Sequence, residues 1–338
     1  MPELRRDPIT QRWVVIATER AKRPHDFARQ PRAKAAGGNE CPFCEGNEGM
    51  TPPEVMAYRP GGTAPNTPGW TVRVVPNLFP AFGPPSGDLD ERRHGIYVAM
   101  NGLGAHEVLI TTPEHVEEVA LLSTEQMALM VKSYVDRHLF HKANPLVAYV
   151  HTIMNYGREA GASREHPHSQ LFAIPLVPGL VETELWGAGV YYEEHGRCVF
   201  CDLLRQELAH GERIVLESER FVVFTPYASQ MPFEMWIAPK EHQPNFEAID
   251  QHDVVEFASA LKVALGKLYA GLNDPPFNYW IHTAPTRRDV GAVYHWHLEI
   301  LPKLSIAAGF ELGTEIMINT ALPETAAAFL RETTAPGR

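Results

Sequence analysis

Residues 165–175, EHPHSQLFAIP, place two histidines two positions apart and a glutamine two positions after the second. Alternate residues of an extended strand lie on one face, about 6.6 to 7 Å apart, so His166, His168 and Gln170 are predicted to point the same way. A lone histidine is most often a polar core residue. Two imidazoles on one face can serve one site, as a metal ligand or a nucleophile, and this stretch therefore predicts a functional centre.

This stretch closes a pattern that occurs twice in the chain. Each copy has a C-x-x-C pair, a histidine after a proline, a helical segment, an apolar run and H-x-H. The first copy contains Cys41, Cys44, His115, His166 and His168, and the second contains Cys198, Cys201, His242, His295 and His297. The interval between the lone histidine and the H-x-H is 51 residues in one copy and 53 in the other. Two copies of one supersecondary unit explain this match.

Each copy also predicts one long helix among strands. Ser123 and Gln126 form a capping box before apolar residues at helical spacing, and a counterpart begins near Asp250. Apolar, β-rich runs occupy residues 13–17, 71–75, 107–112, 147–154, 169–175, 220–225, 233–239, 278–282 and 297–302. These runs predict an α+β fold of two related halves, each an antiparallel sheet that carries a long helix.

Proline, glycine and charged residues interrupt the apolar pattern between residues 178 and 196, so the predicted domains are 1–177 and 178–338. Residues 22–40 and 60–70 are predicted loops.

The bulk composition excludes some classes of function. The chain has 338 residues, 44% of them hydrophobic, and a formal net charge of -11 without a Lys/Arg block, which argues against a nucleic-acid partner. It has no apolar run long enough to cross a membrane, and its start lacks the apolar core of a signal peptide. We expect a soluble, cytoplasmic protein without a membrane partner.

The cysteines predict two metal sites. In a reducing compartment, paired C-x-x-C units bind a metal ion more often than they form disulfides or redox-active dithiols. A tetrahedral zinc ion needs four nitrogen or sulfur ligands, and the repeat supplies the two histidines that each pair lacks. The predicted zinc ligands are Cys41, Cys44, His115 and His166 in the first half, and Cys198, Cys201, His242 and His295 in the second. A closed site of this kind is structural, because it leaves no position for a substrate.

If zinc holds His166, then His168 is positioned on the same face but free to act as a nucleophile. The small residues before the motif, including Gly161 and Ser163, offer N–H and hydroxyl donors, and Gln170 adds an amide, which favours attack at phosphorus. In the second half Glu299 replaces the glutamine. At roughly 4 Å and an effective dielectric near 20 this carboxylate would repel a phosphate oxygen by about 4 kcal/mol, so the first half is predicted to be catalytic.

The set of motifs resembles the galactose-1-phosphate uridylyltransferase family of the histidine-triad superfamily. The resemblance rests on H-P-H-S-Q preceded by G-A-S, on C-P-F-C, on P-E-H and on the N-terminal DPITQRWVVIATERAKRPHDF, and it spans nearly the whole chain. It implies a duplicated histidine-triad fold and a homodimer with active sites at the subunit interface. It also implies a role in galactose metabolism, in which His168 takes the uridylyl group from UDP-glucose and passes it to galactose 1-phosphate.

The resemblance also implies roles for individual residues. Asn77 and Asn155 would contact the nucleotide, and Gly161, Ser163 and Gln170 its phosphates. Arg20 and Arg23 would reach phosphates of the same or the neighbouring subunit, and Glu311 would meet the sugar hydroxyls.

Several alternatives stay open. Ser305 and Met317 stand where the family pattern usually has a lysine and a glutamine, so the acceptor sugar is not fixed. The second C-x-x-C and GFELGTEIMINTALPE are similar to a sister group of ADP-glucose phosphorylases, which transfer adenylyl to inorganic phosphate. The second metal could be zinc or iron, and a third family pattern would instead use Glu184, His282, His295 and His297. A zinc-held nucleotide-binding module without catalysis and a hydrolase are the remaining hypotheses.

Overall fold

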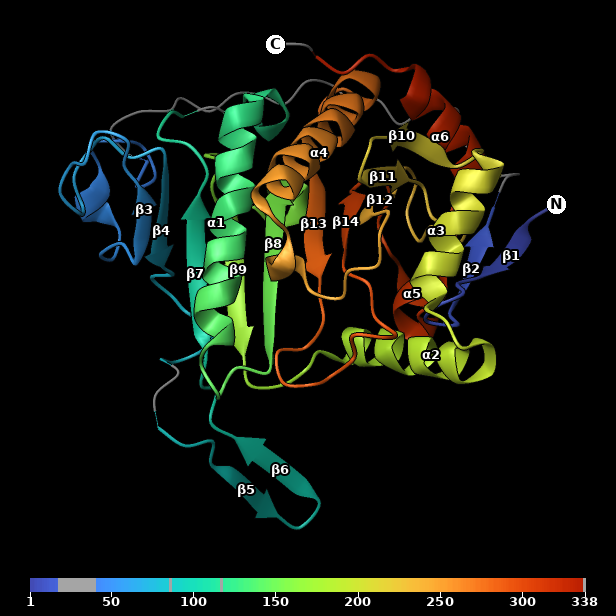
Figure 1. Ribbon diagram of the computed structural model, residues 1–338, viewed down its shortest axis with the longest axis horizontal. Helices are drawn as coiled ribbons and strands as arrows, with labels where there is room; N and C mark the ends of the chain where they lie inside the picture. The colour runs from blue at the N-terminus through green and yellow to red at the C-terminus, as the bar shows by residue number, and fades with distance from the viewer. Residues whose placement is uncertain (18–40, 85–86, 116–117, 337–338) are drawn as a thin grey trace.

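The computed structural model describes residues 1–17, 41–84, 87–115 and 118–336, and its centre is an antiparallel sheet of ten strands (Figure 1). The order across the sheet is β10 (Ile214–Glu217), β11 (Phe221–Phe224), β12 (Met235–Pro239), β14 (His297–Pro302), β13 (Phe277–His282), β8 (Tyr149–Tyr156), β9 (His168–Ile174), β7 (Ala105–Ile110), β4 (Val72–Pro76) and β3 (Met56–Tyr58). The predicted α+β class and the duplication are confirmed, since five strands come from each half.

The two predicted sheets are joined edge to edge. β8 of the first half pairs with β13 of the second from Thr152↔Ile281 to Tyr156↔Phe277. An unpaired strand edge leaves N–H and C=O groups without partners, and this pairing satisfies them. Strands of the two halves therefore lie side by side, and side chains of one half can contact a site in the other. The division at residues 177 and 178 stays a prediction.

Two long helices cover one face of the sheet, as the helical spacing predicted (Figure 1). α1 (Thr124–Lys142) begins after Ser123, whose hydroxyl accepts the Gln126 N–H at 3.1 Å, and α4 (Gln251–Leu272) begins after Asp250, which caps the Asp253 N–H at 2.7 Å. The Gln126 side chain donates to backbone carbonyls of Thr71 and Thr111 instead of closing the capping box.

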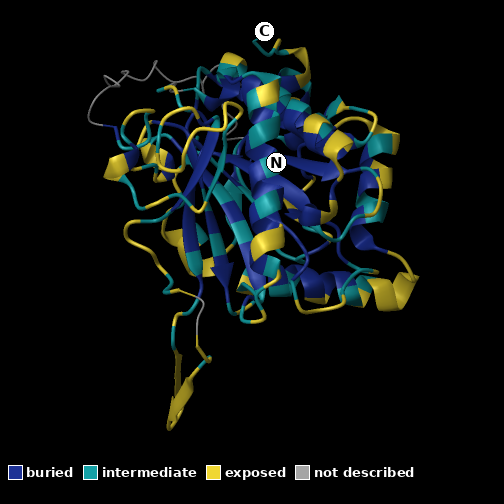
Figure 2. Cartoon of the chain, turned by 60° about the vertical axis from the view of Figure 1, so that its left-hand side comes forward, coloured by how far each residue is buried: buried dark blue, intermediate teal, exposed yellow. Residues whose placement is uncertain are grey.

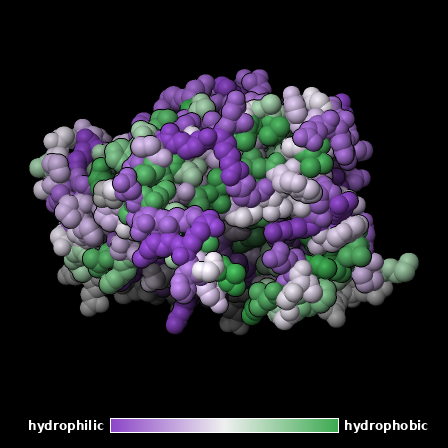
Figure 3. All heavy atoms as spheres, turned by 90° about the horizontal axis from the view of Figure 1, so that it is seen from below, coloured by the Kyte–Doolittle hydropathy of each residue, from purple (hydrophilic) through white to green (hydrophobic). Residues whose placement is uncertain are grey.

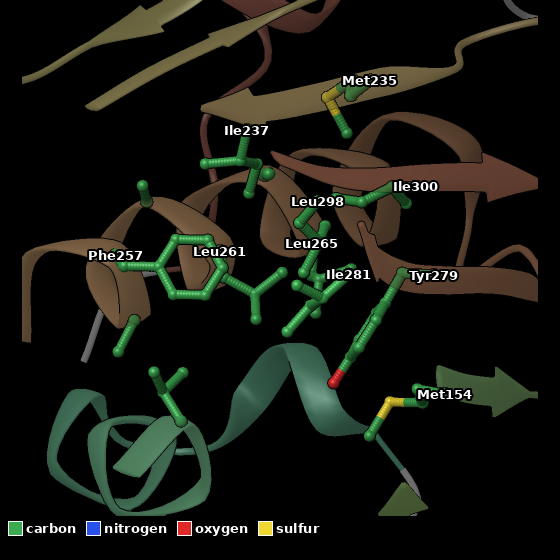
Figure 4. Close-up of a cluster of buried hydrophobic side chains, with 14 of the residues drawn as sticks. Met154, Met235, Ile237, Phe257, Leu261, Leu265, Tyr279, Ile281, Leu298 and Ile300 are labelled. Atoms are coloured by element: carbon green, nitrogen blue, oxygen red, sulfur yellow. The ribbon is translucent and has the colours of Figure 1, made fainter. Parts of the chain in front are cut away.

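The core beneath these helices belongs to both halves. Figure 4 shows Met154 of β8 beside Tyr279 of β13, and Phe257 and Leu261 of α4 facing the strands. These side chains belong to one buried cluster that runs from Val74 to Leu330 along the sequence. The two halves therefore share one hydrophobic core.

The opposite face carries Phe43 and Trp70 on β4 and β7 in the first half and two helices in the second half. There α2 (Gly179–His195) and α3 (Val199–His210) pack on β11 and β12. The segment predicted as a domain boundary is thus mostly helix α2, which has a buried stripe that includes Val181, Leu185 and Ala188. A Cβ added at Gly187 would lie 1.9 Å from the Ile9 carbonyl oxygen, so only glycine lets the N-terminal segment approach α2.

The remaining elements lie around the large sheet. β1 (Glu3–Arg6), β2 (Trp13–Ile16) and β15 (Met317–Asn319) form a small sheet, in which β15 runs parallel to β2. α5 (Gly309–Thr314) precedes β15, and α6 (Pro323–Glu332) follows it. Short 3₁₀ turns lie at Glu48–Met50, Val119–Leu121, Arg158–Ala160 and Phe246–Ala248. The predicted loop at residues 60–70 contains no helix or strand, and residues 22–40 lie outside the described part.

A hairpin projects from the body. β5 (Glu91–His94) and β6 (Tyr97–Met100) pair only with each other, and every residue of both strands is exposed (Figure 2). Figure 3 looks at the molecule from the side on which this hairpin projects, where hydrophilic and hydrophobic residues are interspersed. Among the described helices, none is both long enough and apolar enough to cross a bilayer.

Candidate active site and metal centres

The first predicted ligand set comes together in the structure. Cys41, Cys44, His115 and His166 each offer one ligand atom, and these four atoms lie within 4.8 Å of one another. Cys44 Sγ is 3.3 Å from His115 Nδ1, and His166 Nδ1 is 3.7 Å from both sulfur atoms. A tetrahedral zinc ion with bonds of about 2.0 to 2.3 Å requires ligands spaced in this way. The residues therefore fit a closed four-coordinate zinc site.

The second nitrogen of His166 supports the same assignment. His166 Nε2 lies 2.8 Å from the Thr112 carbonyl oxygen, which can only accept a hydrogen bond. The proton is therefore on Nε2, and Nδ1 keeps its lone pair for the metal. Burial lowers the pKa of His166 to about 4, so the ring is neutral at pH 7, as a metal ligand must be.

The second predicted set repeats this geometry. Cys198, Cys201, His242 and His295 also group within 4.8 Å, with Cys201 Sγ 3.2 Å from His242 Nδ1 and 3.7 Å from His295 Nδ1. The Nε2 atoms of the two histidines face the carbonyl oxygens of Gly291 and Pro239 at 2.6 and 2.9 Å. This set has the same donor chemistry as the first and fits zinc equally well.

The alternative ligand set of Glu184, His282, His295 and His297 does not form. His295 turns its Nδ1 to the cysteines, and Glu299 takes its place in a separate buried group with Glu184, His282 and His297. In this group His282 Nδ1 lies 2.9 Å from a Glu184 oxygen and 3.3 Å from a Glu299 oxygen.

His168 stands beside the first metal set but is not part of it. Its Nδ1 lies 2.9 Å from the His166 carbonyl oxygen, an obligate acceptor, so Nδ1 carries the proton and Nε2 keeps a bare lone pair. Burial, together with the charge of Arg164, lowers the pKa of His168. A neutral imidazole with an unprotonated Nε2 is the form that can attack an electrophile.

Amide groups surround this histidine. Gln170 lies on the same face of β9, and Asn77, directly after β4, is brought near it because both side chains contact Nε2 of His106. On β8, Asn155 follows Met154, the cross-strand partner of Ser169, and so lies beside His168. The sheet therefore places three of the predicted nucleotide and phosphate contacts on the face that holds His168.

The predicted donor loop adjoins Asn155. It runs through the 3₁₀ turn η5 (Arg158–Ala160) to Gly161, whose φ of 88° lies in the left-handed region that favours glycine. Ser163 follows as an exposed residue. Gly161 lies beside Asn155, since a Cβ added there would be 3.9 Å from Asn155 Nδ2.

The position equivalent to His168 in the second half is His297, and Glu299 and Trp236 occupy the space around its ring. His297 Nδ1 faces the His295 carbonyl oxygen at 3.2 Å, and its Nε2 lies 3.2 Å from a Glu299 oxygen. Phe200 of α3 lies 5.4 Å from His297, much as Phe43 lies 5.1 Å from His168, but the Trp236 ring also stacks on His297 with centroids 4.4 Å apart. The cavity that these side chains leave is about 10 Å³, which holds no substrate.

Other predicted residues lie elsewhere. Glu311 is on α5, where its carboxylate accepts the Ala308 N–H at 2.9 Å. Arg20 and Arg23 lie outside the described residues. A cavity of about 460 Å³ lies between the N-terminal segment, α3 and β12, and it is lined by none of the predicted site residues.

Sequence reasoning missed three residues near His168. His106 and Asn278 bind the amides of Gln170 and Asn155, and the charge of Arg164 reaches His168. Arg164 follows Ser163 in the donor loop, so its position was a usable signal. His106 and Asn278 gave none, because their roles depend on cross-strand neighbours.

A duplicated fold with His168 beside a Cys2His2 group, and with side-chain amides on the same face, is an arrangement suited to a transferase that uses a histidine nucleophile. Residues 1–178 match the N-terminal domain of galactose-1-phosphate uridyl transferase, and residues 187–336 match its C-terminal domain. The chain therefore belongs to the galactose-1-phosphate uridyl transferase family, as the motifs indicated, and is an enzyme of that family.

Its relatives include two kinds of enzyme. ADP-glucose phosphorylase of Arabidopsis thaliana is 36% identical over 98% of this chain and 93% of its own length. Galactose-1-phosphate uridylyltransferase of Thermotoga maritima is 31% identical over 98% and 99%. The crystal structure of an Arabidopsis thaliana ADP-glucose phosphorylase with bound ADP-glucose superposes with a TM-score of 0.82, at 34% identity, over 99% of this chain and 100% of that one.

Proposed function

We propose that the protein transfers a nucleotidyl group between phosphates through a covalent intermediate on His168. The supporting observation is the protonation of the ring. His168 donates its Nδ1–H to the His166 carbonyl oxygen, so its Nε2 carries no proton and lies on a face with amide donors. UDP-glucose is the proposed donor and galactose 1-phosphate the acceptor, which places the reaction in galactose metabolism.

The reaction would have two displacements. His168 Nε2 attacks the α-phosphorus of UDP-glucose, an N–P bond forms, and the P–O bond to the β-phosphate breaks with release of glucose 1-phosphate. A phosphate oxygen of galactose 1-phosphate then attacks the same phosphorus, the N–P bond breaks, and UDP-galactose leaves. N–H donors that face the phosphoryl oxygens would stabilise their charge in both steps.

The two Cys2His2 sets would hold zinc, with iron as the alternative in the second. A bound ion would be structural, because each set supplies four ligands and leaves no open position. Through His166, the first ion would fix the start of β9 and so the direction of His168. We infer a reducing compartment such as the cytoplasm, since the four cysteines form no disulfide and would be kept as thiolate ligands.

A second candidate is adenylyl transfer from ADP-glucose to inorganic phosphate. It is supported by the 36% identity to an ADP-glucose phosphorylase and by the second C-x-x-C pair. The same histidine would act in both reactions, so the two candidates differ only in the base and the acceptor.

We also propose a homodimer in which each active site uses both subunits. Glu311 lies on α5, where it accepts the Ala308 N–H. Among the described interactions it has none with Asn77, Asn155 or Gln170, and a second subunit would bring it to the sugar. Arg20 and Arg23 would act on phosphates in the same way. The net charge of -11 favours small sugar phosphates, held by local donors, over nucleic acid as partners.

A paired assay tests the function. The protein is incubated with α-phosphate-labelled UDP-glucose or ADP-glucose, and acid-labile, base-stable protein label is measured together with release of glucose 1-phosphate. We expect label and release in equal amounts, with the better donor identifying the base. Nucleotide binding without release would show a non-catalytic module, and nucleoside monophosphate as the only nucleotide product, released together with glucose 1-phosphate, would show a hydrolase. Either outcome rejects the proposal.

A further inference from the structure

The orientation of the Gln170 amide is fixed by His106. The Ala81 backbone N–H, which can only donate, lies 3.2 Å from His106 Nδ1, and burial lowers the pKa of this ring, so it is neutral with its proton on Nε2. The Gln170 atom 2.7 Å from Nε2 must therefore be the carbonyl oxygen. Its NH2 group points away from His106. The ring itself is stacked on Phe172 with centroids 4.1 Å apart.

The same arrangement leaves Asn77 free to bind. Its NH2 group lies 3.1 Å from His106 Nε2 but cannot donate to a nitrogen that carries a proton. Its Oδ1 accepts the Phe79 N–H at 2.9 Å, which fixes its orientation. The NH2 hydrogens of Asn77 are thus available to a ligand.

The orientation of the Asn155 amide is fixed by Asn278, which belongs to the second half. The Ala160 carbonyl, an obligate acceptor, lies 2.8 Å from the Asn278 amide, so that atom is Nδ2. The same Nδ2 lies 2.8 Å from the Asn155 amide, whose facing atom must then be the oxygen. The Asn155 NH2 group is turned toward Gly161, where it would lie 3.9 Å from an added Cβ.

We propose that His106 and Asn278 are positioning residues, which hold the amides of Gln170 and Asn155 with both NH2 groups toward the phosphoryl group that His168 attacks. This inference rests on the proposed function. Phosphate oxygens only accept hydrogen bonds, so an amide that is turned over replaces a donor with a repelling oxygen. Orientation therefore matters as much as the presence of the amide.

The inference gives the second half a part in the first site. Asn278 is the cross-strand partner of Asn155 where β13 pairs with β8, and it also holds the donor loop through Ala160. The second half is therefore more than a structural duplicate of the first.

Double-mutant cycles test the inference. The rate at which α-phosphate-labelled UDP-glucose and ADP-glucose label the protein is measured in single turnover for Asn278→Ala, Asn155→Ala and the double variant, and for His106→Phe, Gln170→Ala and their double variant. Each single change should slow labelling about 10- to 100-fold, and the half-saturating donor concentration should change less. The His106/Gln170 double variant should be as slow as Gln170→Ala alone, because His106 acts through that amide. The Asn278/Asn155 double variant should be slower than Asn155→Ala only by the part that Asn278 contributes through Ala160, and so by much less than the product of the two single effects.

One further substitution separates orientation from packing. Asn278→Asp keeps the side-chain shape, but its carboxylate would attract the Asn155 NH2 group and turn the carbonyl oxygen to the phosphate. We expect it to be slower than Asn278→Ala, and the difference between the two variants to shrink when Asn155 is alanine. Single-variant rates equal to wild type, or effects that multiply in the double variants, would overturn the inference. Unlabelled wild type would instead reject the proposed function. Unfolding temperature and zinc content identify variants that fail to fold.

Discussion

At the scale of single residues, one backbone carbonyl separates the roles of the two histidines in H-P-H. His166 donates its Nε2 proton to Thr112 and so offers Nδ1 to the metal, whereas His168 donates its Nδ1 proton to the His166 carbonyl and so exposes Nε2. Neighbouring imidazoles thus present opposite nitrogens. Their assignment follows from obligate acceptors alone.

Replacement of the nucleophile gives the most direct prediction. His168→Gly should abolish protein label from the sugar nucleotide, because no other bare imidazole nitrogen lies between the described amides. Zinc content and unfolding temperature should stay close to wild type, since His168 binds no metal. The exposed His94 in β5 supplies the control: His94→Gly should keep the full rate of labelling. Labelling of His168→Gly at the wild-type rate would place the nucleophile elsewhere.

A second histidine predicts how stability depends on pH. His138 on α1 is 1% exposed and faces the Thr152 hydroxyl at 2.9 Å, and burial lowers its pKa to about 3. Between about pH 6.5 and 3 the unfolded chain binds the proton and the folded chain does not, so stability falls as the pH falls.

This histidine should contribute a loss of about 1.4 kcal/mol for each pH unit below 6.5. His138→Gln should reduce the slope of the free energy of unfolding against pH by this amount below pH 6.5. Urea denaturation at pH 7.5, 6.5 and 5.5 measures the slope. An unchanged slope would contradict the buried neutral ring.

At the scale of elements, the repeat and the hydrophobic spacing predicted the two long helices, the residues that group into both Cys2His2 sets, and nine strands, but they missed β1, β3, β5, β6, β10 and β15. The predicted features are properties of short segments and of one duplicated pattern. The contact between Asn278 and Asn155 joins residues 123 positions apart, across a strand pair that no local pattern specifies. The union of the two sheets and the helix α2 in the predicted boundary were missed for a related reason, since tertiary packing decides them.

Helix α2 offers a matched pair of glycine substitutions. Gly187→Ala would place a methyl group 1.9 Å from the Ile9 carbonyl oxygen, whereas an added Cβ at Gly189 meets nothing within 4 Å. Gly187→Ala should cost about 1 to 3 kcal/mol from overpacking, and Gly189→Ala should stabilise by about 0.5 to 1 kcal/mol from helix propensity. Thermal unfolding of both variants measures the contrast. Equal effects would show that α2 does not pack on the N-terminal segment as described.

The metal sets predict a difference between the halves. Cys41→Ser and Cys198→Ser should each lower bound zinc by about half, as measured by elemental analysis, because one thiolate is lost from one of two sites. Only Cys41→Ser should also slow histidine labelling strongly, since its site includes His166 next to the nucleophile. Equal loss of labelling in both variants would mean that the metals act through global stability.

At the scale of the whole molecule, the ten strands and the shared core form one cooperative unit. β8 and β13 pair from Thr152↔Ile281 to Tyr156↔Phe277, and the largest core cluster contains residues of both halves. We expect urea unfolding to show a single transition, with tryptophan fluorescence and loss of labelling at the same midpoint. A fragment of residues 1–178 would expose the edge of β8 and should aggregate or stay unfolded. Two separate transitions would show that the halves fold independently.

The ring of Trp236 stacks on His297 and so limits the number of nucleotidyl groups that one chain can carry. The duplicated unit provides two equivalent histidine positions, and the indole ring of Trp236 covers the second of them. However large the excess of donor, a fully reacted chain should gain the mass of a single nucleotide.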